Sequence, residues 1–229
     1  MQRFLTCILL LGLIVMPVRA ADAKYVALTF DDGPSGKYTR SLLDGLAFRG
    51  VKATFLLCGY RMEQYPDITQ RIFDEGHEIG YHGFSHKTMS DMSRRSIGQE
   101  LIDSEKLLPE DCDPVFFRPP GGIVTDGVRQ VAEARQLAIL SWSVDPKDWA
   151  TTSVGSIETA VLKRIQDGDI ILLHDMSISS VQAALDIVDV LQEQGYRFVT
   201  VSELAKLRRV PIRPGRMYER FAPKEEHVK

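Results

Sequence analysis

The sequence predicts an α/β fold in which parallel strands form a barrel or an open sheet. Short apolar runs alternate with amphipathic stretches along the chain, which is typical of parallel strands joined by helices. The sequence contains no internal repeat, so we expect one continuous unit. The seven strand candidates are Tyr25–Phe30, Ala53–Cys58, Glu78–Tyr81, Val115–Phe117, Leu137–Trp142, Asp169–Leu173 and Arg197–Val201.

Three of the intervening stretches carry apolar residues at helical spacing. Gly50 and Gly195 follow two of these stripes and can end a helix in the left-handed conformation. Ser93 precedes the third stripe and can cap the start of its helix. The stripes consist of Leu42, Leu43, Leu46 and Ala47; of Ile97, Leu101, Ile102 and Leu108; and of Val181, Ala184, Leu185, Val188 and Leu191.

Residues 1–20 are predicted to be a signal peptide. Arg3 gives a positive start, an apolar run follows from Phe4 to Val15, and small residues precede a cleavage site after Ala20. The run is shorter than the roughly 20 apolar residues of a membrane span, although an uncleaved anchor is the alternative. We therefore expect export to the periplasm, the cell envelope or the extracellular space.

The rest of the chain is predicted to be one domain, residues 21–207, and a surface tail, residues 208–229, that is rich in arginine and proline. Without Arg3 and Arg19, 26 basic residues face 31 acidic ones, a formal net charge of −5. This balance argues against a nucleic-acid-binding protein, which needs a basic face. No second long apolar run predicts a membrane span in the mature chain, and we expect a monomer.

Cys58 and Cys112 are expected to be free thiols. Cys58 ends one apolar run and Cys112 precedes a later one, so parallel strands would separate them to opposite ends. A disulfide needs Cα atoms within about 7 Å of each other. Neither residue belongs to a Cys/His zinc pattern.

Two adjacent acids, Asp31 and Asp32, follow the first apolar run and precede a Gly-Pro turn. Neighbouring side chains at the end of a strand point in different directions. One carboxylate can therefore bind a metal while the other moves a proton. The alternative interpretation is a plain turn whose Asp side chains accept hydrogen bonds from local N–H groups.

His82 and His86 follow the third apolar run and lie four residues apart. On one turn of helix such a pair faces the same way and can share a metal ion. With one carboxylate the pair leaves positions open for water, which suits Zn²⁺ or another first-row divalent ion. Taken alone, the pair is equally compatible with two ordinary histidines of the surface or core.

Three more charged residues follow later strand candidates. His174 follows the apolar run that ends at Leu173. It can be a general acid or base, or a core residue whose ring nitrogens have hydrogen-bond partners. Asp145 follows the fifth candidate, and a carboxylate beside a histidine fixes its tautomer and raises its pKa. Arg118 follows the fourth and has a guanidinium fork that can hold a carboxylate such as Asp31.

All of these groups come directly after separate strand candidates. In a parallel barrel the carboxyl ends of the strands converge on one face, where active sites are built. Agreement at five unrelated positions favours one shared site over five separate structural explanations.

The five segments resemble, in order, the motifs of the NodB-like polysaccharide deacetylases, carbohydrate esterase family four. Two positions depart from the family pattern: Gly83 replaces a hydroxyl residue, and Gly121 replaces an aromatic one. The resemblance covers roughly residues 25–205. The matching segments are Thr29–Pro34 (T-F-D-D-G-P), His82–His86 (H-[ST]-x-x-H), Arg118–Gly122 (R-P-P-Y-G), Asp145–Trp149 (D-x-x-D-W) and Leu172–His174 (L-x-H).

The resemblance implies a distorted (β/α)₇ barrel with a single NodB-homology domain. It also implies a metal-dependent hydrolase that removes N-acetyl groups from N-acetylglucosamine-containing polysaccharide and releases acetate. The polymer is peptidoglycan, chitin oligomers or an exported polysaccharide. Alternatives are an acetyl-ester or other amide hydrolase of the same family, or an inactive sugar-binding protein.

The resemblance also implies roles for particular residues. One divalent ion, usually Zn²⁺ with Co²⁺ or Ni²⁺ as alternatives, is bound by Asp32, His82 and His86. Asp31 is the general base, held by Arg118, and His174 is the general acid, tuned by Asp145. The backbone N–H of Gly121 stabilises the oxyanion, and Trp149 and Leu172 form the wall of the acetyl pocket.

Overall fold

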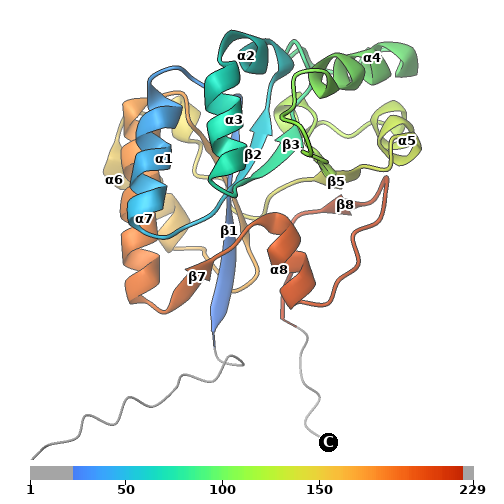
Figure 1. Cartoon of the computed structure of the whole chain (residues 1–229). Coiled ribbons are helices and arrows are strands. Elements are labelled where there is room, and N and C mark those ends of the chain that lie inside the picture. The colour runs from blue at the N-terminus through green and yellow to red at the C-terminus, as the bar shows by residue number, and fades with distance from the viewer. Residues whose placement is uncertain (1–22, 224–229) are drawn as a thin grey trace, which may run out of the picture.

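The computed structural model describes residues 23–223 and arranges them as a curled parallel sheet surrounded by helices (Figure 1). Within these residues the sheet has eight strands in the order β6-β1-β2-β3-β4-β5-β8, and β7 pairs with β1. This confirms the predicted α/β fold. The strands are β1 (Lys24–Asp31), β2 (Thr54–Leu57), β3 (Glu78–Tyr81), β4 (Phe116–Phe117), β5 (Ala138–Leu140), β6 (Ile170–His174), β7 (Tyr196–Phe198) and β8 (Met217–Tyr218).

The sheet curls into a distorted barrel without forming a continuous ladder all the way round. Neighbouring strands along the path are parallel, and β5 has no full ladder with β6. Instead, a single bridge joins Val144, beyond the end of β5, to Ile171 in β6. The Leu172 N–H donates to the Val144 carbonyl at 2.9 Å. The chain after β5 is thereby held against β6, close to where the predicted site residues lie.

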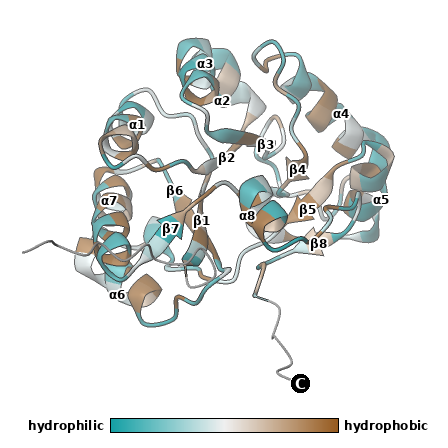
Figure 2. Ribbon diagram, turned by 60° about the horizontal axis from the view of Figure 1, so that its bottom comes forward, coloured by the Kyte–Doolittle hydropathy of each residue, from teal (hydrophilic) through white to brown (hydrophobic). Residues whose placement is uncertain are grey.

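Helices cover the outside of the sheet, and their apolar stripes face it (Figures 1 and 2). Gly50 and Gly195 have φ values of 65° and 82°, as predicted for residues that follow a helix. Ser93 accepts a hydrogen bond from the Ser96 N–H at 3.1 Å, so the predicted cap is confirmed. The helices are α1 (Tyr38–Phe48), α2 (Gly59–Gln64), α3 (Pro66–Asp74), α4 (Arg94–Glu105), α5 (Asp126–Ala134), α6 (Val154–Leu162), α7 (Ile178–Glu193) and α8 (Val201–Leu207), with short 3₁₀ turns at Pro120–Gly122 and Asp148–Ala150.

Both faces of the sheet are buried, which explains why the strands are almost continuously apolar. A large cluster lies between the strands and the outer helices and includes Leu28, Phe55 and Leu173. A second cluster includes Leu56 and Ile170 together with residues of α8. Figure 2 shows α8 across the middle of the ring of helices, so it covers the sheet at the end opposite to the carboxyl ends of the strands.

The prediction of a surface tail from residue 208 is wrong for the described part of that segment. Strand β8 extends the sheet, with Leu140 of β5 opposite Tyr218. Tyr218 and Phe221 are only 5% and 2% exposed, and their rings stack with centroids 5.3 Å apart. Both aromatic residues lie among charged and proline residues. A strand of two residues in such a segment is too short to show the alternation of apolar and polar residues by which strands are predicted.

Two further predictions concern the thiols and the membrane. Cys58 and Cys112 are both free, as predicted. Among residues 23–223, no helix is long and apolar enough to cross a bilayer. The predicted signal peptide, residues 1–20, lies outside the described residues.

Candidate metal and catalytic centre

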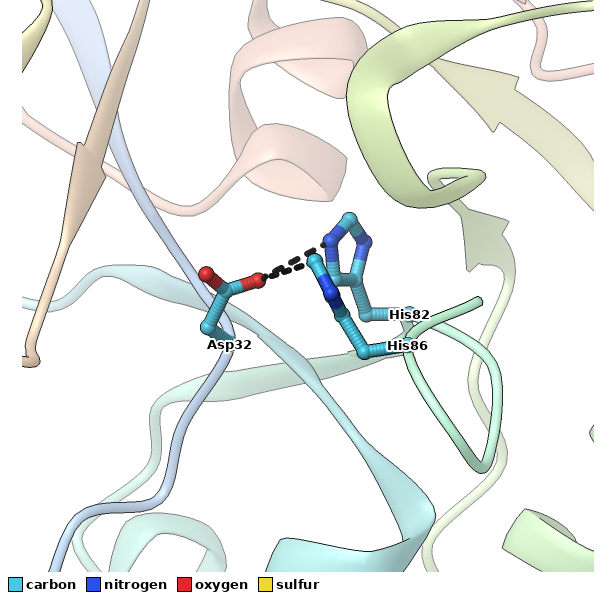
Figure 3. A group of neighbouring side chains, drawn as sticks. All are labelled: Asp32, His82 and His86. Atoms are coloured by element: carbon cyan, nitrogen blue, oxygen red, sulfur yellow. Dashed lines mark ion pairs between the residues drawn. The ribbon is translucent and has the colours of Figure 1, made fainter. Parts of the chain in front are cut away.

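Asp32, His82 and His86 come together at the carboxyl ends of β1 and β3. The Asp32 Oδ1 atom lies 3.2 Å from His82 Nε2 and 2.9 Å from His86 Nε2. Figure 3 shows the carboxylate pointing at both imidazole rings, which reach it from a single loop. One donor atom of each residue lies within 4.8 Å of the other two, a spacing that a single metal ion can bridge.

The backbone between His82 and His86 is an irregular loop, so the predicted helical turn is wrong. Gly83 and His86 have positive φ values of 78° and 57°, and the loop folds back on itself to bring the two rings together. The ring centroids are 5.2 Å apart. A spacing of four residues therefore produces neighbouring histidines here through left-handed turns, which the spacing alone does not reveal.

The donor atoms are suited to a first-row divalent ion. His82 Nδ1 lies 2.7 Å from the Arg118 carbonyl oxygen, which can only accept, so Nδ1 carries a proton and Nε2, which faces Asp32, is the nitrogen available to a metal. Burial alone would raise the pKa of Asp32, but hydrogen bonds from the two histidines hold that pKa well below its usual range. Two imidazole nitrogens and one carboxylate oxygen leave positions open for water or substrate.

Asp31 lies beside this group but has different partners. Arg118 Nη1 donates to Asp31 Oδ1 at 2.6 Å and to the Thr29 hydroxyl at 2.9 Å, so the predicted contact of Arg118 with Asp31 is present. Arg118 is fully buried and Asp31 is 3% exposed. The guanidinium also donates to the Leu140 and Ser141 carbonyls, at 3.3 and 2.9 Å. Arg118 therefore has little freedom, and it fixes one oxygen of Asp31.

The carboxylate bound to His174 is Asp148, so the prediction of Asp145 in that position is wrong. His174 Nδ1 lies 2.8 Å from Asp148 Oδ1, and the His174 N–H donates to Asp148 Oδ2, also at 2.8 Å. Asp145 instead accepts a hydrogen bond from the Lys147 N–H at 2.8 Å. Lys147 has a φ of 55°, so the chain reverses there and carries the second acid of the motif to the histidine.

Asp148 also changes the acidity of His174. Burial alone would lower the pKa of His174, but the hydrogen bond and charge of Asp148, helped by the charges of Asp31 and Asp32, raise it to about 9. Because Nδ1 is occupied by Asp148, His174 has Nε2 free to exchange a proton. Asp145 and Asp148 belong to one motif, and their spacing in the sequence does not show which of them contacts His174.

A cavity of about 410 Å³ joins these groups. Every predicted site residue lines it except Arg118, which lies behind Asp31. Trp142, which the sequence predicts only as the end of a strand, is also in the wall. The lining residues are Asp31, Asp32, His82, His86, Gly121, Gly122, Trp142, Asp145, Trp149, Leu172 and His174.

A family model described as polysaccharide deacetylase matches residues 19–140, more than half of the chain. This chain belongs to the polysaccharide deacetylase family. The resemblance inferred from five short motifs is thereby confirmed.

Individual members of the family are similar over most of this chain. A peptidoglycan-N-acetylglucosamine deacetylase of Bacillus cereus is 40% identical, and the match covers 82% of this chain and 91% of that protein. The Listeria monocytogenes peptidoglycan-N-acetylglucosamine deacetylase PgdA is 36% identical over 81% of this chain, which spans only 40% of its length. A family 4 acetyl xylan esterase from Clostridium thermocellum, solved with a cobalt ion, is 35% identical with a TM-score of 0.80; 86% of this chain and 98% of that one are covered.

This polysaccharide deacetylase has an open wall where the family motif has an aromatic residue. Gly121 has a φ of 69°, and a Cβ placed there would meet no atom within 4 Å. A Cβ at Gly122, in contrast, would lie 2.5 Å from the Trp142 ring. The indole ring therefore packs against the second glycine and lies 5.5 Å above the Arg118 guanidinium. Trp142 supplies the aromatic surface on this side of the cavity.

A second cavity, of about 610 Å³, lies next to the first. Trp149, His174 and Asp32 line both cavities, and Trp149 is 68% exposed. The remaining wall is rich in hydroxyl groups from the chain after Trp149 and from the start of α7. These are Thr151, Thr152, Ser177, Ser179 and Ser180.

Proposed function

We propose that this protein removes N-acetyl groups from an N-acetylglucosamine-containing polysaccharide and releases acetate. One observation carries the proposal. The Asp32, His82 and His86 cluster shares a cavity with a carboxylate held by arginine and a histidine held by aspartate. Such a cavity has the parts needed for metal-assisted hydrolysis of an acyl group.

Asp32, His82 and His86 would bind one divalent ion, for which we propose Zn²⁺. When bound, such an ion polarises the acyl carbonyl and makes a neighbouring water more acidic. The cobalt ion in the similar acetyl xylan esterase supports a divalent metal at these three residues. The histidine nitrogens and single carboxylate suit zinc, cobalt and nickel.

Asp31 would act as the general base. Its Oδ1 is occupied by Arg118, while Oδ2 lies 3.8 Å from His82 Nε2, on the side of the metal ligands. A water molecule attacking the acetamide carbon there would give its proton to Asp31. Arg118 would keep the carboxylate pointed at the water. Negative charge that develops on the acetamide oxygen would be stabilised in part by the Gly121 N–H.

His174 would act as the general acid. Cleavage of the carbon–nitrogen bond leaves a poor leaving group unless the nitrogen receives a proton, and His174 Nε2 would donate it. Asp148 would hold the ring and stabilise its protonated form. Trp149 and Leu172 would enclose the acetyl methyl group. The products would be acetate and the free amino sugar.

The second cavity supports a polymeric substrate. A sugar bound in the first cavity would leave its neighbour beside Trp149, whose exposed ring can stack on the apolar face of a pyranose. The hydroxyl groups of Thr151 and Thr152 would bind the hydroxyls of that neighbour. Peptidoglycan is our first choice because two of the similar deacetylases are named for it.

Export of this enzyme belongs to the same proposal. Residues 1–20 would direct the chain out of the cytoplasm and be removed, and the catalytic domain would begin at residue 21. A cell-wall polymer lies outside the membrane, so an enzyme that acts on it needs such a signal. We further propose that the mature protein acts as a monomer.

Acetate release from the N-acetylglucosamine pentamer tests the proposal. We expect the purified protein to release acetate, to lose that activity when the metal is stripped and to recover it when Zn²⁺ is returned. Asp31→Asn should reduce kcat by at least about 100-fold because the base is removed. Absence of acetate from the pentamer and from peptidoglycan at any metal loading would refute N-deacetylation.

An acetyl-ester hydrolase is the second candidate, because the similar Clostridium thermocellum protein is an acetyl xylan esterase. The same metal-dependent attack would release acetate from a sugar ester, whose oxygen leaving group depends less on His174. Rates on N-acetyl and O-acetyl oligosaccharides of equal length separate the two functions. A higher kcat/KM on the ester would favour the second.

A further inference from the structure

Glu100, on helix α4, binds the loop that carries both histidines of the metal cluster. Its Oε2 atom accepts hydrogen bonds from the Phe84 and Ser85 N–H groups, at 2.8 and 2.7 Å. Its Oε1 atom accepts from the Ser85 hydroxyl at 2.8 Å. One carboxylate therefore holds the middle of the segment that runs from His82 to His86. Hydrogen bonds to an ionised acceptor are about twice as strong as neutral ones.

The opposite side of the same loop is held by the start of α2. The Gly59 N–H donates to the Gly83 carbonyl at 2.9 Å, and the Tyr60 N–H donates to the Phe84 carbonyl at 3.0 Å. The carbonyl groups of the loop are thus bound by α2 and two of its N–H groups by Glu100. Without Glu100 those two N–H groups would lose their acceptor in a partly buried place.

His86 depends on this loop more than His82 does. The His82 ring is 3% exposed and is fixed by the Arg118 carbonyl oxygen. The His86 side chain is 41% exposed, and within the described residues its ring nitrogen is paired only with Asp32. His86 also has a positive φ of 57°, which a non-glycine residue keeps only when its surroundings impose it. Its position therefore follows from the backbone that Glu100 holds.

Helix α4, which carries Glu100, is packed against the core of the protein. Ile97 and Leu101, which flank Glu100 on the helix, are fully buried in one apolar cluster with Met89 and Phe117. Gly83 allows the loop to lie close to this helix, because a Cβ at that position would lie 2.8 Å from the Met89 side chain and 3.4 Å from Glu100 Oε2. The loop and the helix are thus built to fit each other closely.

We propose that Glu100 is a positioning residue for the metal site. It holds the loop so that His86 Nε2 stays within reach of Asp32 and His82, and it does so without contacting the metal or the substrate. This inference rests on the proposed function, since it needs a metal at the three-residue cluster.

Metal affinity of Glu100 variants tests this role directly. Glu100→Ala removes all three acceptor contacts, whereas Glu100→Gln keeps a neutral oxygen that can still accept. Loss of a residue that orients metal ligands costs about 10–100-fold in affinity. We expect the Zn²⁺ dissociation constant, measured by chelator competition, to rise within that range for Glu100→Ala and by less for Glu100→Gln. The visible spectrum of the Co²⁺-loaded protein should change, and excess metal should restore much of the activity.

Asp103→Asn is the matched control. Asp103 lies on the same helix, and within residues 23–223 its side chain is hydrogen-bonded only to Lys106 and Gln99 at the surface. The variant therefore removes a charge of the same sign at a distance from the loop. We expect its metal affinity and Co²⁺ spectrum to equal those of the wild type.

The outcomes separate this inference from the function on which it rests. Unchanged affinity and spectrum in folded Glu100 variants, with a wild type that binds metal, would overturn the role of Glu100 alone. A wild type that binds neither Zn²⁺ nor Co²⁺ would overturn both. If Glu100→Ala does not fold, Glu100→Gln decides the matter, because an affinity equal to that of Asp103→Asn would contradict the proposal.

Discussion

At the scale of single residues, the two adjacent acids have opposite surroundings. Asp31 is the last residue of β1 and turns to a buried arginine, while Asp32 has a φ of 73° and turns to two histidines. The left-handed backbone at Asp32 sends the two carboxylates in different directions. The sequence suggested this division because neighbouring side chains diverge, and the described contacts agree with it.

The partner of His174 is the residue that spacing could not identify. Two acids follow β5 three positions apart, and each can in principle reach the end of β6. The choice depends on the reversal at Lys147, a non-glycine residue in the left-handed region. Such a conformation leaves no clear signal in composition or periodicity. Sequence reasoning therefore found the histidine and its kind of partner but chose the wrong acid.

Asp148→Asn is expected to move the alkaline limit of activity to lower pH. The pKa of His174 is raised to about 9 largely by Asp148, so the histidine stays protonated through neutral pH and loses its proton as pH rises through that value. Without the charge, burial lowers the pKa, and the acid is depleted at neutral pH. We expect kcat at pH 8 to fall by about 100-fold or more, with a smaller loss at pH 6.

Profiles of kcat against pH for Asp148→Asn and Asp145→Asn check this expectation. Asp145 accepts a hydrogen bond from the Lys147 N–H and has none with His174, so its variant should keep the alkaline limit of the wild type. An alkaline limit that moves only in Asp145→Asn would show that Asp145 tunes the histidine after all.

At the scale of elements, the helices and strands were easier to predict than the loops that follow them. Apolar periodicity located the strands and three helices, and cap residues marked ends such as Ser93 and Gly195. The spacing of His82 and His86 predicts a helical turn, but the segment between them is an irregular loop. Its actual form depends on contacts with α2 and α4, which are distant in sequence.

Ser93→Ala is expected to destabilise the protein through α4. The Ser93 hydroxyl accepts a hydrogen bond from the Ser96 N–H, one of the donors that a helix start leaves without a partner. Loss of such a cap costs about 1 kcal/mol, while glycine at the same position costs only a few tenths. Urea unfolding should show a decrease of that size for Ser93→Ala and a smaller one for Ser93→Gly. Equal losses in the two variants would argue against the cap.

At the scale of the whole molecule, the site is assembled at the carboxyl ends of five strands. Asp32, His82, Gly121 and Asp148 follow β1, β3, β4 and β5 in turn, and His174 is the last residue of β6. The carboxyl ends of parallel strands converge on one face, so the positions of these motifs after separate strand candidates predict a shared site. They do not predict how the sheet ends, because β8 has two residues and enters from a segment rich in charge.

That last segment is expected to contribute to the stability of the whole fold. Phe221 is 2% exposed, stacks on Tyr218, and donates its N–H to the Gly168 carbonyl at 2.7 Å. Truncation of a buried phenylalanine costs about 3–5 kcal/mol, through lost transfer energy and the cavity left behind. We expect the free energy of unfolding of Phe221→Ala to fall by that amount.

Glu219→Ala, at an exposed neighbour, is the control and should change the free energy of unfolding by less than about 0.5 kcal/mol. Similar small changes in the free energy of unfolding of both variants would show that the segment behaves as a surface tail. A large loss in Phe221→Ala alone would show that this segment, which pairs with β5 after the last helix, is part of the packed fold.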